Sequence, residues 1–245
     1  MQFPTRERDW ERIAKSFEVK CNFPNYLGSV DGKHVAIVPP PGAGSYFFNY
    51  KGYNSQVLIG RADSNYELIY FNFDTNGRVS DWCFLEYTDF YDKLQTECLK
   101  IPESSDVKRR KLPYVFIGDE AFSLRKDFLK PYSVKQLTRE RKIFNYRLCR
   151  ARRIIENVFG ILVARFGIFK THINIKLDNI KDAVMASCAL HNFLCRTSPD
   201  TCTPPECFDT EDLQNGTVTA GLGSNPSSMA TLKRGNNRNH QLTGR

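Results

Sequence analysis

The amino-acid sequence predicts an α/β protein in which helices flank a mixed β-sheet. Three observations lead to this prediction. Alternating apolar residues predict a first strand, two β-rich runs around a short polar turn predict a hairpin, and helical patterns enclose one more short apolar run further along. This order of elements is typical of a single sheet with helices on its faces.

The N-terminal part is predicted to contain one amphipathic helix and the first strand. In residues 7–17 the apolar side chains follow helical spacing, at Trp10, Ile13, Ala14 and Phe17. The stretch YLGSVDGKHVAIVPP then alternates and ends in prolines, which predicts a strand from about Leu27 to Val38.

The next stretch, NSQVLIGRADSNYELIYFNFDTNG, contains two β-rich runs. The turn-prone Asp63-Ser64-Asn65 joins them, so we expect a hairpin that pairs with the first strand as an antiparallel three-stranded unit. Residues 80–99 then show helical spacing, with Phe84, Tyr87, Tyr91 and Leu94 along one side.

Further along the chain, LPYVFIGDEAF is predicted to be a buried strand that ends at Gly-Asp, and the preceding basic KRRK at 108–111 a loop. A long helical region is expected over 139–169 and a last helix over 179–195. The order strand, hairpin, helix, strand, helix, helix matches the ribonuclease H-like core.

Three segments follow from this pattern. Residues 1–25 are expected to be a short helical lead-in, and residues 26–196 the α/β domain. Residues 197–245 contain one aromatic residue in 49, so they bury too little apolar surface to offset their ordering entropy, and we expect a disordered tail.

The net charge of +8 is concentrated in one segment. Residues 139–170 hold nine Lys or Arg and two acids, which favours a polyanion partner, usually nucleic acid. A solvated basic helix without a partner is the alternative. No apolar run is long enough to cross a membrane, and the N-terminus lacks a signal-peptide core, so we expect no membrane partner.

The eight cysteines are scattered without any CxxC pair, which favours reduced thiols inside a cell. Cys188, His191 and Cys195 lie at helical spacing and could be zinc ligands. A helix face that packs into the core explains them more simply.

Three acids occupy positions at which carboxylates could converge. Asp31 lies in the first strand, Asp119 closes the later buried strand, and Glu156 lies on the long basic helix. Such hard oxygen ligands suit Mg²⁺ or Mn²⁺, and a pair of these ions can act on a phosphodiester. Each acid also has a structural alternative: a turn at Asp31, a helix N-cap at Asp119, and for Glu156 an ion pair with Arg152 or Arg153.

Six motifs, in order, carry a family resemblance. They are NFPNYLGSVDGKHVAI, SYFFNYKGYNSQVLI, TNGRVSD, LPYVFIGDEAF, NYRLCRARRIIENVFGIL and ALHNFL, and together they span roughly residues 8 to 195. In this order they closely resemble the PIF/Harbinger transposase superfamily, and more narrowly the Harbinger-derived nucleases of animals. The resemblance implies a ribonuclease H-like fold with a DDE catalytic triad.

Matched motif to motif, the resemblance assigns the triad to Asp31, Asp119 and Glu156. It implies that Asp31 bridges two divalent ions, Mg²⁺ or Mn²⁺, while the other two acids hold one each. DNA cleavage would then leave a 3′-hydroxyl and a 5′-phosphate. Two accessory positions are His34, which could orient a carboxylate or be a core histidine, and Asp81, which could shape the site or cap the next helix.

The resemblance also implies DNA as the partner and the nucleus as the location. Arg147, Arg150, Arg152 and Arg153 would contact the DNA backbone with little sequence choice. The family usually has an upstream helical region, whereas this chain begins just ahead of the matched domain. We therefore expect either a truncated chain or DNA targeting by a separate Myb-like protein.

A second hypothesis is a domesticated module that binds DNA or protein without cleaving. The complete triad favours the enzyme. Two departures from the family pattern favour the module: Trp82 follows the Ser-Asp motif, where small residues are common, and Arg61 lies in a strand position that is usually apolar.

Overall fold

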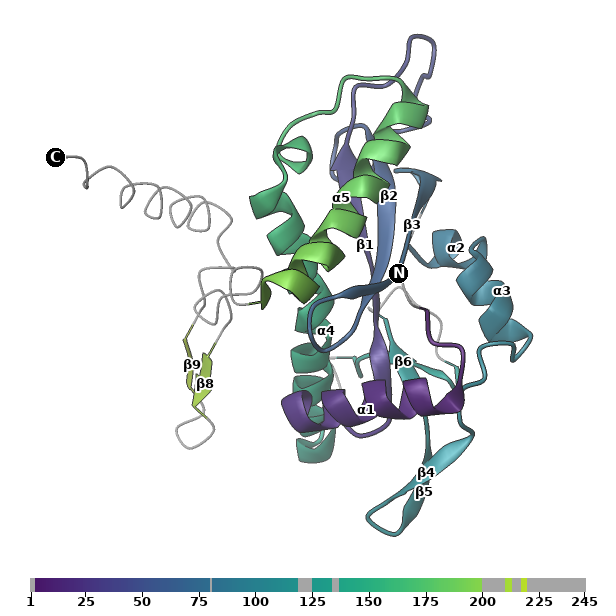
Figure 1. Cartoon of the computed structure of the whole chain (residues 1–245), viewed down its shortest axis with the longest axis vertical. Coiled ribbons are helices and arrows are strands. Elements are labelled where there is room, and N and C mark those ends of the chain that lie inside the picture. The colour runs from purple at the N-terminus through teal and green to yellow at the C-terminus, as the bar shows by residue number, and fades with distance from the viewer. Residues whose placement is uncertain are drawn as a thin grey trace, which may run out of the picture.

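The computed structural model describes most of the chain, with short gaps and a largely omitted C-terminal segment (Figure 1). The described residues are 3–79, 81–118, 125–133, 137–199, 210–212 and 217–219, with the side chains of residues 81, 82, 210–212, 217 and 218 left out.

The centre of the molecule is a five-stranded mixed sheet with strand order β3-β2-β1-β6-β7. The long strands β1 (Tyr26–Ala36), β2 (Ser55–Ala62) and β3 (Leu68–Asn76) are antiparallel, as predicted from the hairpin. The short strand β6 (Val115–Ile117) runs parallel to β1, and β7 (Phe128–Leu129) runs parallel to β6. The predicted mixed sheet is therefore confirmed.

Helices cover both faces of this sheet (Figure 1). The helices α4 (Arg139–Arg165) and α5 (Leu177–Thr197) pack on one face, where Leu148, Ile155 and Val158 of α4 join a large apolar core. The helices α2 (Asp81–Glu86) and α3 (Asp89–Gln95) cover the other face over a second core.

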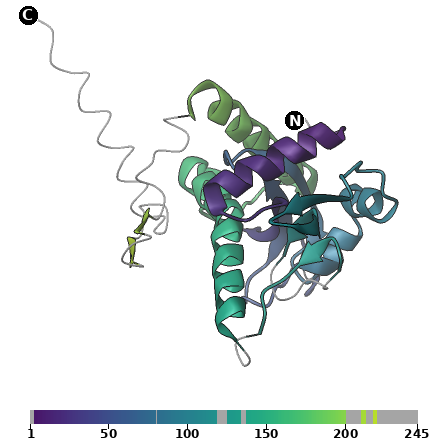
Figure 2. The same ribbon diagram turned by 90° about the horizontal axis from the view of Figure 1, so that it is seen from below.

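The N-terminal helix α1 (Glu7–Cys21) contributes to both cores, because it crosses one end of the sheet (Figure 2). Trp10 lies in the core on the α2–α3 side and Phe17 in the core on the α4–α5 side, and neither side chain is exposed. The segment expected as a lead-in is thus packed into the domain, and its helix extends four residues beyond residue 17.

Two local expectations were wrong. The single helix expected over 80–99 is divided at Thr88, whose hydroxyl accepts a hydrogen bond from the Tyr91 N–H and caps α3. Tyr87 therefore leaves the helical stripe and is 86% exposed. The KRRK segment forms the turn and second strand of a hairpin, β4 (Ser104–Val107) and β5 (Arg110–Pro113), with positive φ angles at Lys108 and Arg109.

The remaining elements are short. The long helix α4 ends at Arg165, before a single 3₁₀ turn at Gly167–Phe169. Of the segment expected to be disordered, the described pieces are residues 197–199, of which Thr197 ends α5, and two paired strands, β8 (Thr210–Asp212) and β9 (Thr217–Thr219). No helix within the described residues has the length and apolar character needed to cross a membrane.

Candidate active site

Asp31 lies in the middle of β1, on the face that α4 covers. Its partner across the antiparallel ladder is Gly60 of β2, and residues directly opposite each other point to the same face. A Cβ atom placed on Gly60 would lie 3.3 Å from the ring of Phe159 in α4. The absence of a side chain at Gly60 therefore lets α4 approach the sheet beside Asp31, which is half-buried.

Glu156 lies on α4, one turn before Phe159, and its side chain is 45% exposed. Arg152, one turn earlier, donates from Nη2 to Glu156 Oε1 at 2.6 Å and from Nε to the same oxygen at 3.1 Å. The predicted ion pair with Arg152 is thus present. Both bonds end on Oε1, and no described residue hydrogen-bonds Oε2.

The flank of α4 that carries Glu156 can be identified from its neighbours. Burial raises the pKa of Tyr66, in the turn between β2 and β3, to about 12, and a hydrogen bond with Asn157 and the charge of Arg153 oppose this rise. The charge of Arg152 acts instead on Tyr26, the first residue of β1. Because successive helical residues are rotated by about 100°, Glu156 lies with Arg152 on the flank turned away from Tyr66.

Asp119, the second acid, lies outside the described residues. The strand that precedes it is described: Ile117 of β6 pairs with Ser29 of β1, two residues before Asp31. The Gly118 N–H donates to the Leu129 carbonyl at 3.0 Å and continues the pairing with β7. The strand that leads to Asp119 therefore lies directly beside the part of β1 that precedes Asp31.

Lys33 is a further candidate that the sequence analysis did not select. It follows Asp31 by two residues, so both side chains point to the α4 face of β1. Burial and the neighbouring Lys51 lower the pKa of Lys33, and the Asp31 carboxylate opposes this shift. The spacing of two residues between Asp31 and Lys33 in a predicted strand could have indicated that both side chains lie on the same face.

His34 is nearly buried and points to the opposite face. It pairs with Val57, a residue of the core on the α2–α3 side, and its Nδ1 hydrogen-bonds Ser55 Oγ at 2.9 Å. Burial, with Lys51 and Lys33 nearby, lowers the pKa of His34 to about 4. The contacts of this neutral histidine favour a role in holding the loop that follows β1.

The four arginines expected to contact DNA lie on different sides of α4. Arg152 lies beside Glu156, whereas the charge of Arg150 acts on Cys21 at the end of α1. Arg153 faces Tyr66, and Arg147 lines a small apolar hollow next to Phe23. Of these four, Arg152 hydrogen-bonds a described triad candidate, Glu156.

The comparison with protein families is decided by one match. The model of the DDE superfamily endonucleases matches residues 30–192, more than half of the chain. This chain belongs to the DDE superfamily of endonucleases. No curated protein and no solved structure matches it with significance.

The matched region of this DDE endonuclease contains all three candidate acids and both accessory residues. Asp81 is the first residue of α2. A negative charge at this position stabilises a helix, because the N-terminus carries the positive end of the helix dipole. Within the described residues, to which Asp119 does not belong, no group of three or more His, Cys, Asp or Glu side chains is close enough to hold a metal ion.

The other metal candidate of the DDE endonuclease, the Cys188-His191-Cys195 face, belongs to the core. His191 is fully buried, and its Nε2–H donates to the Tyr66 carbonyl at 2.8 Å. Cys188 is also fully buried, and burial raises its pKa to about 12. These contacts agree with the interpretation as a packed helix face.

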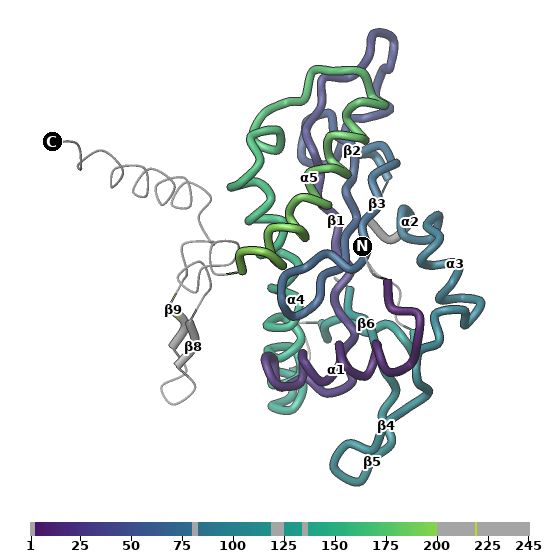
Figure 3. Tube along the Cα trace, viewed as in Figure 1, coloured from purple at the N-terminus to yellow at the C-terminus, as the bar shows by residue number. Residues whose placement is uncertain are grey.

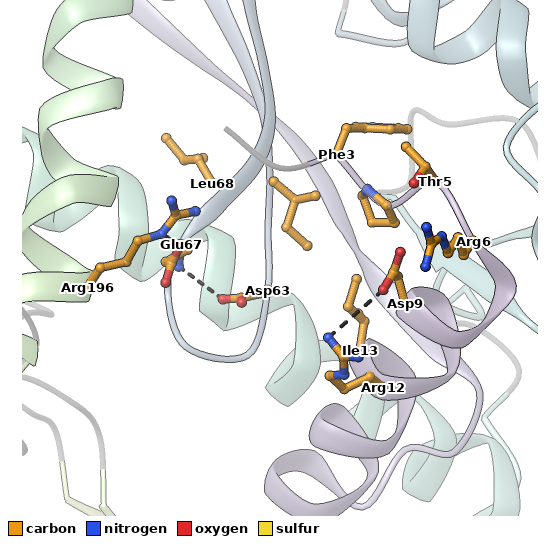
Figure 4. A pocket seen from close by; sticks show the side chains of 12 residues that line it. Phe3, Thr5, Arg6, Asp9, Arg12, Ile13, Asp63, Glu67, Leu68 and Arg196 are labelled. Atoms are coloured by element: carbon orange, nitrogen blue, oxygen red, sulfur yellow. Dashed lines mark hydrogen bonds and ion pairs between the residues drawn. The ribbon is translucent and has the colours of Figure 1, made fainter.

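A hollow of about 730 Å³ in the DDE endonuclease lies between α1 and the β2–β3 turn (Figure 4). None of the described triad candidates lines it. Its charges are largely satisfied within the protein: Arg196 binds Glu67 at 2.6 Å, and Asp63 accepts the Glu67 N–H at 3.0 Å. We therefore place the candidate site at β1 and α4.

Proposed function

We propose that this chain is a divalent-metal-dependent DNA endonuclease of Harbinger transposase descent, with Asp31, Asp119 and Glu156 as its catalytic acids. The observation that carries the proposal is the placement of two of them. Asp31 of β1 and Glu156 of α4 come from distant parts of the sequence, and both belong to the side of the sheet where α4 packs over Gly60.

The residues present fit a divalent cation. Asp31 is half-buried beside a strand that carries no side chain at Gly60, and both Arg152 bonds to Glu156 leave Oε2 available. Carboxylate oxygens are the ligands that Mg²⁺ and Mn²⁺ prefer. Asp31, Asp119 and Glu156 would hold these ions, whose bound form would supply charge neutralisation at the attacking and leaving oxygens of a phosphodiester.

The chain's own cations would position the DNA. Arg152 holds Glu156 through one carboxylate oxygen, so the second oxygen keeps one orientation. The positive charges of Arg152 and Lys33 flank the two acids and would bind the phosphates on either side of the scissile bond. We further propose a nuclear location and, for target selection, a separate Myb-like DNA-binding protein.

One observation favours the second candidate, a domesticated module that binds without cleaving. Glu156 lies on an exposed helix flank and already has an ion-pair partner within the protein, Arg152. In that case the basic helix would dock on a partner, and the acids would serve the fold.

The test is a nicking assay on supercoiled plasmid in the presence of Mn²⁺ or of EDTA. We expect the wild-type chain to nick only with the metal, and Asp31→Asn to lose this activity. Asp106→Asn, which alters an exposed acid in the β4–β5 hairpin, is the matched control and should nick like the wild type. Metal-dependent nicking by Asp31→Asn at the wild-type rate would contradict the assignment.

A further inference from the structure

The loop between β1 and β2 exposes three aromatic rings to solvent. Tyr46 is 58% exposed, Phe48 50% and Tyr50 84%. The loop projects past the end of the sheet, near the segment that leads into α5 (Figure 3). A single exposed aromatic residue is ordinary, but three within five positions of one loop form an exposed apolar surface, which is typical of a binding site.

The loop is organised by the buried residues between the exposed ones. Phe47 is 5% exposed and belongs to the core, while Asn49 is 2% exposed. Asn49 donates to Ser55 Oγ at 2.8 Å, and its side-chain oxygen accepts the backbone N–H groups of Lys51 at 2.9 Å and Tyr53 at 3.3 Å. Phe48 and Tyr50, on either side of Asn49, are therefore held outward by a preformed turn.

A positive charge lies beside one of these rings. The Lys51 ammonium lies 5.5 Å from the centre of the Tyr50 ring. The bridge between Ile37 and Ile173 joins the loop base to residues 157–177. Neither that segment nor residues 32–62 contain an acid. Exposed aromatic rings with interspersed cations are the combination that binds single-stranded nucleic acid.

The loop also adjoins the strand that carries Asp31. The centre of the Tyr50 ring lies 5.4 Å from that of His34, three residues after Asp31 in β1. We propose that the aromatic loop, residues 45–53, binds unpaired DNA bases by stacking them on Tyr50 and Phe48, next to the site where the strand is cleaved. The proximity to a cleavage site depends on the proposed nuclease function, whereas the stacking of bases is inferred from the exposed rings of the loop alone.

The test measures binding without catalysis, by fluorescence anisotropy in EDTA. Two labelled strands of equal length and charge are compared, an oligothymidylate and an abasic strand. Because a base stacked on an aromatic ring contributes roughly five- to 150-fold in affinity, Tyr50→Ala should weaken oligothymidylate binding about tenfold. The abasic strand, which offers only phosphates, should lose less than about twofold, because Lys51 remains.

Tyr87→Ala is the matched control, because Tyr87 is equally exposed at 86% but follows α2 on the other face of the sheet. It should bind both strands like the wild type. Equal losses of Tyr50→Ala on both strands, or no loss on either, would overturn the proposal. So would Tyr50-dependent binding to phosphatidylserine vesicles combined with Tyr50-independent binding to oligothymidylate.

Failure of the proposed function is separable from failure of this inference. Asp31→Asn should bind oligothymidylate in EDTA at least as tightly as the wild type, whether or not the chain cleaves DNA. A protein that stacks bases but never nicks would contradict the nuclease alone. A protein that nicks, with a Tyr50→Ala variant of unchanged affinity for both strands, would contradict the stacking alone.

Discussion

Replacing Arg61 with methionine should leave the fold as stable as the wild type or stabilise it, although Arg61 makes several contacts. This side chain of β2 is fully buried. Its Nε and Nη2 donate to the Leu27 carbonyl at 3.1 and 2.5 Å, and its guanidinium lies 4.6 Å from the Trp10 ring centre. Within the described part of the chain Nη1 has no hydrogen-bond partner.

The magnitude follows from the cost of burying this charge. Burial lowers the pKa of Arg61 from 12.5 to about 9, which corresponds to ~5 kcal/mol against the charged form. Methionine would lose charged hydrogen bonds worth ~1.5–3 kcal/mol and a cation–ring contact worth ~0.5–2 kcal/mol. The difference predicts a stabilisation of ~0–3 kcal/mol for Arg61→Met, in line with other buried charges replaced by apolar residues.

Urea unfolding of the wild type, Arg61→Met and Arg61→Ala measures this balance. Arg61→Ala is the control for packing: it would leave a cavity against Trp10 and Phe116, so it should be less stable than Arg61→Met by ~2–5 kcal/mol. A destabilisation of Arg61→Met by more than ~2 kcal/mol, close to that of Arg61→Ala, would refute the reasoning. The bonds to Leu27 would then outweigh the burial cost.

Two further predictions concern pH and salt. Burial lowers the pKa of His34 to about 4 in the folded chain, so the unfolded chain, with the ordinary value of 6.5, binds the proton more tightly. The contribution of His34 to the free energy of unfolding should therefore be complete above pH 6.5 and decline as the pH falls toward 4. The urea midpoint should fall less between pH 7 and pH 5 for His34→Gln than for the wild type. An equal decline in both proteins would exclude His34 as the cause. DNA affinity should fall with salt, and Arg152→Gln should lower the slope of log K against log salt by about one, whereas Arg150→Gln, beside Cys21, should leave it unchanged. An unchanged slope for Arg152→Gln would remove Arg152 from the interface.

The sequence predicted the elements that have strong local patterns. The period of two in β1 and the polar turn Asp63-Ser64-Asn65 were sufficient for the three-stranded unit, because both signals are local. The division of the helix at Thr88 was missed, since the residues on either side keep helical spacing and only the cap stops the helix. The β4–β5 hairpin was missed because its turn residues, Lys108 and Arg109, are not typical of positive φ.

The candidate site was predictable in part. The sequence selected Asp31 and Glu156 through the motifs around them, and the structure adds the close approach of α4 to Gly60 of β2, the residue paired with Asp31. The distribution of the arginines around α4 could not be predicted, because it depends on which flank packs toward Tyr66. The buried Arg61 was unexpected in a strand, and its acceptor, the Leu27 carbonyl beside Gly28 at φ +129°, becomes apparent only in the folded chain.

The most direct test of the central claim uses Glu156→Gln, with nicking rate and metal-free DNA affinity measured on the same protein. As an exposed ion-pair partner of Arg152, Glu156 contributes less than ~1 kcal/mol to stability, so the variant should fold normally. As a metal ligand it supplies an anionic oxygen that glutamine lacks, so nicking with Mn²⁺ should fall by about 100-fold or more. DNA binding in EDTA should persist or tighten, because a negative charge beside the phosphates is gone. Nicking by Glu156→Gln at the wild-type rate, with wild-type metal dependence, would contradict the assignment of the triad.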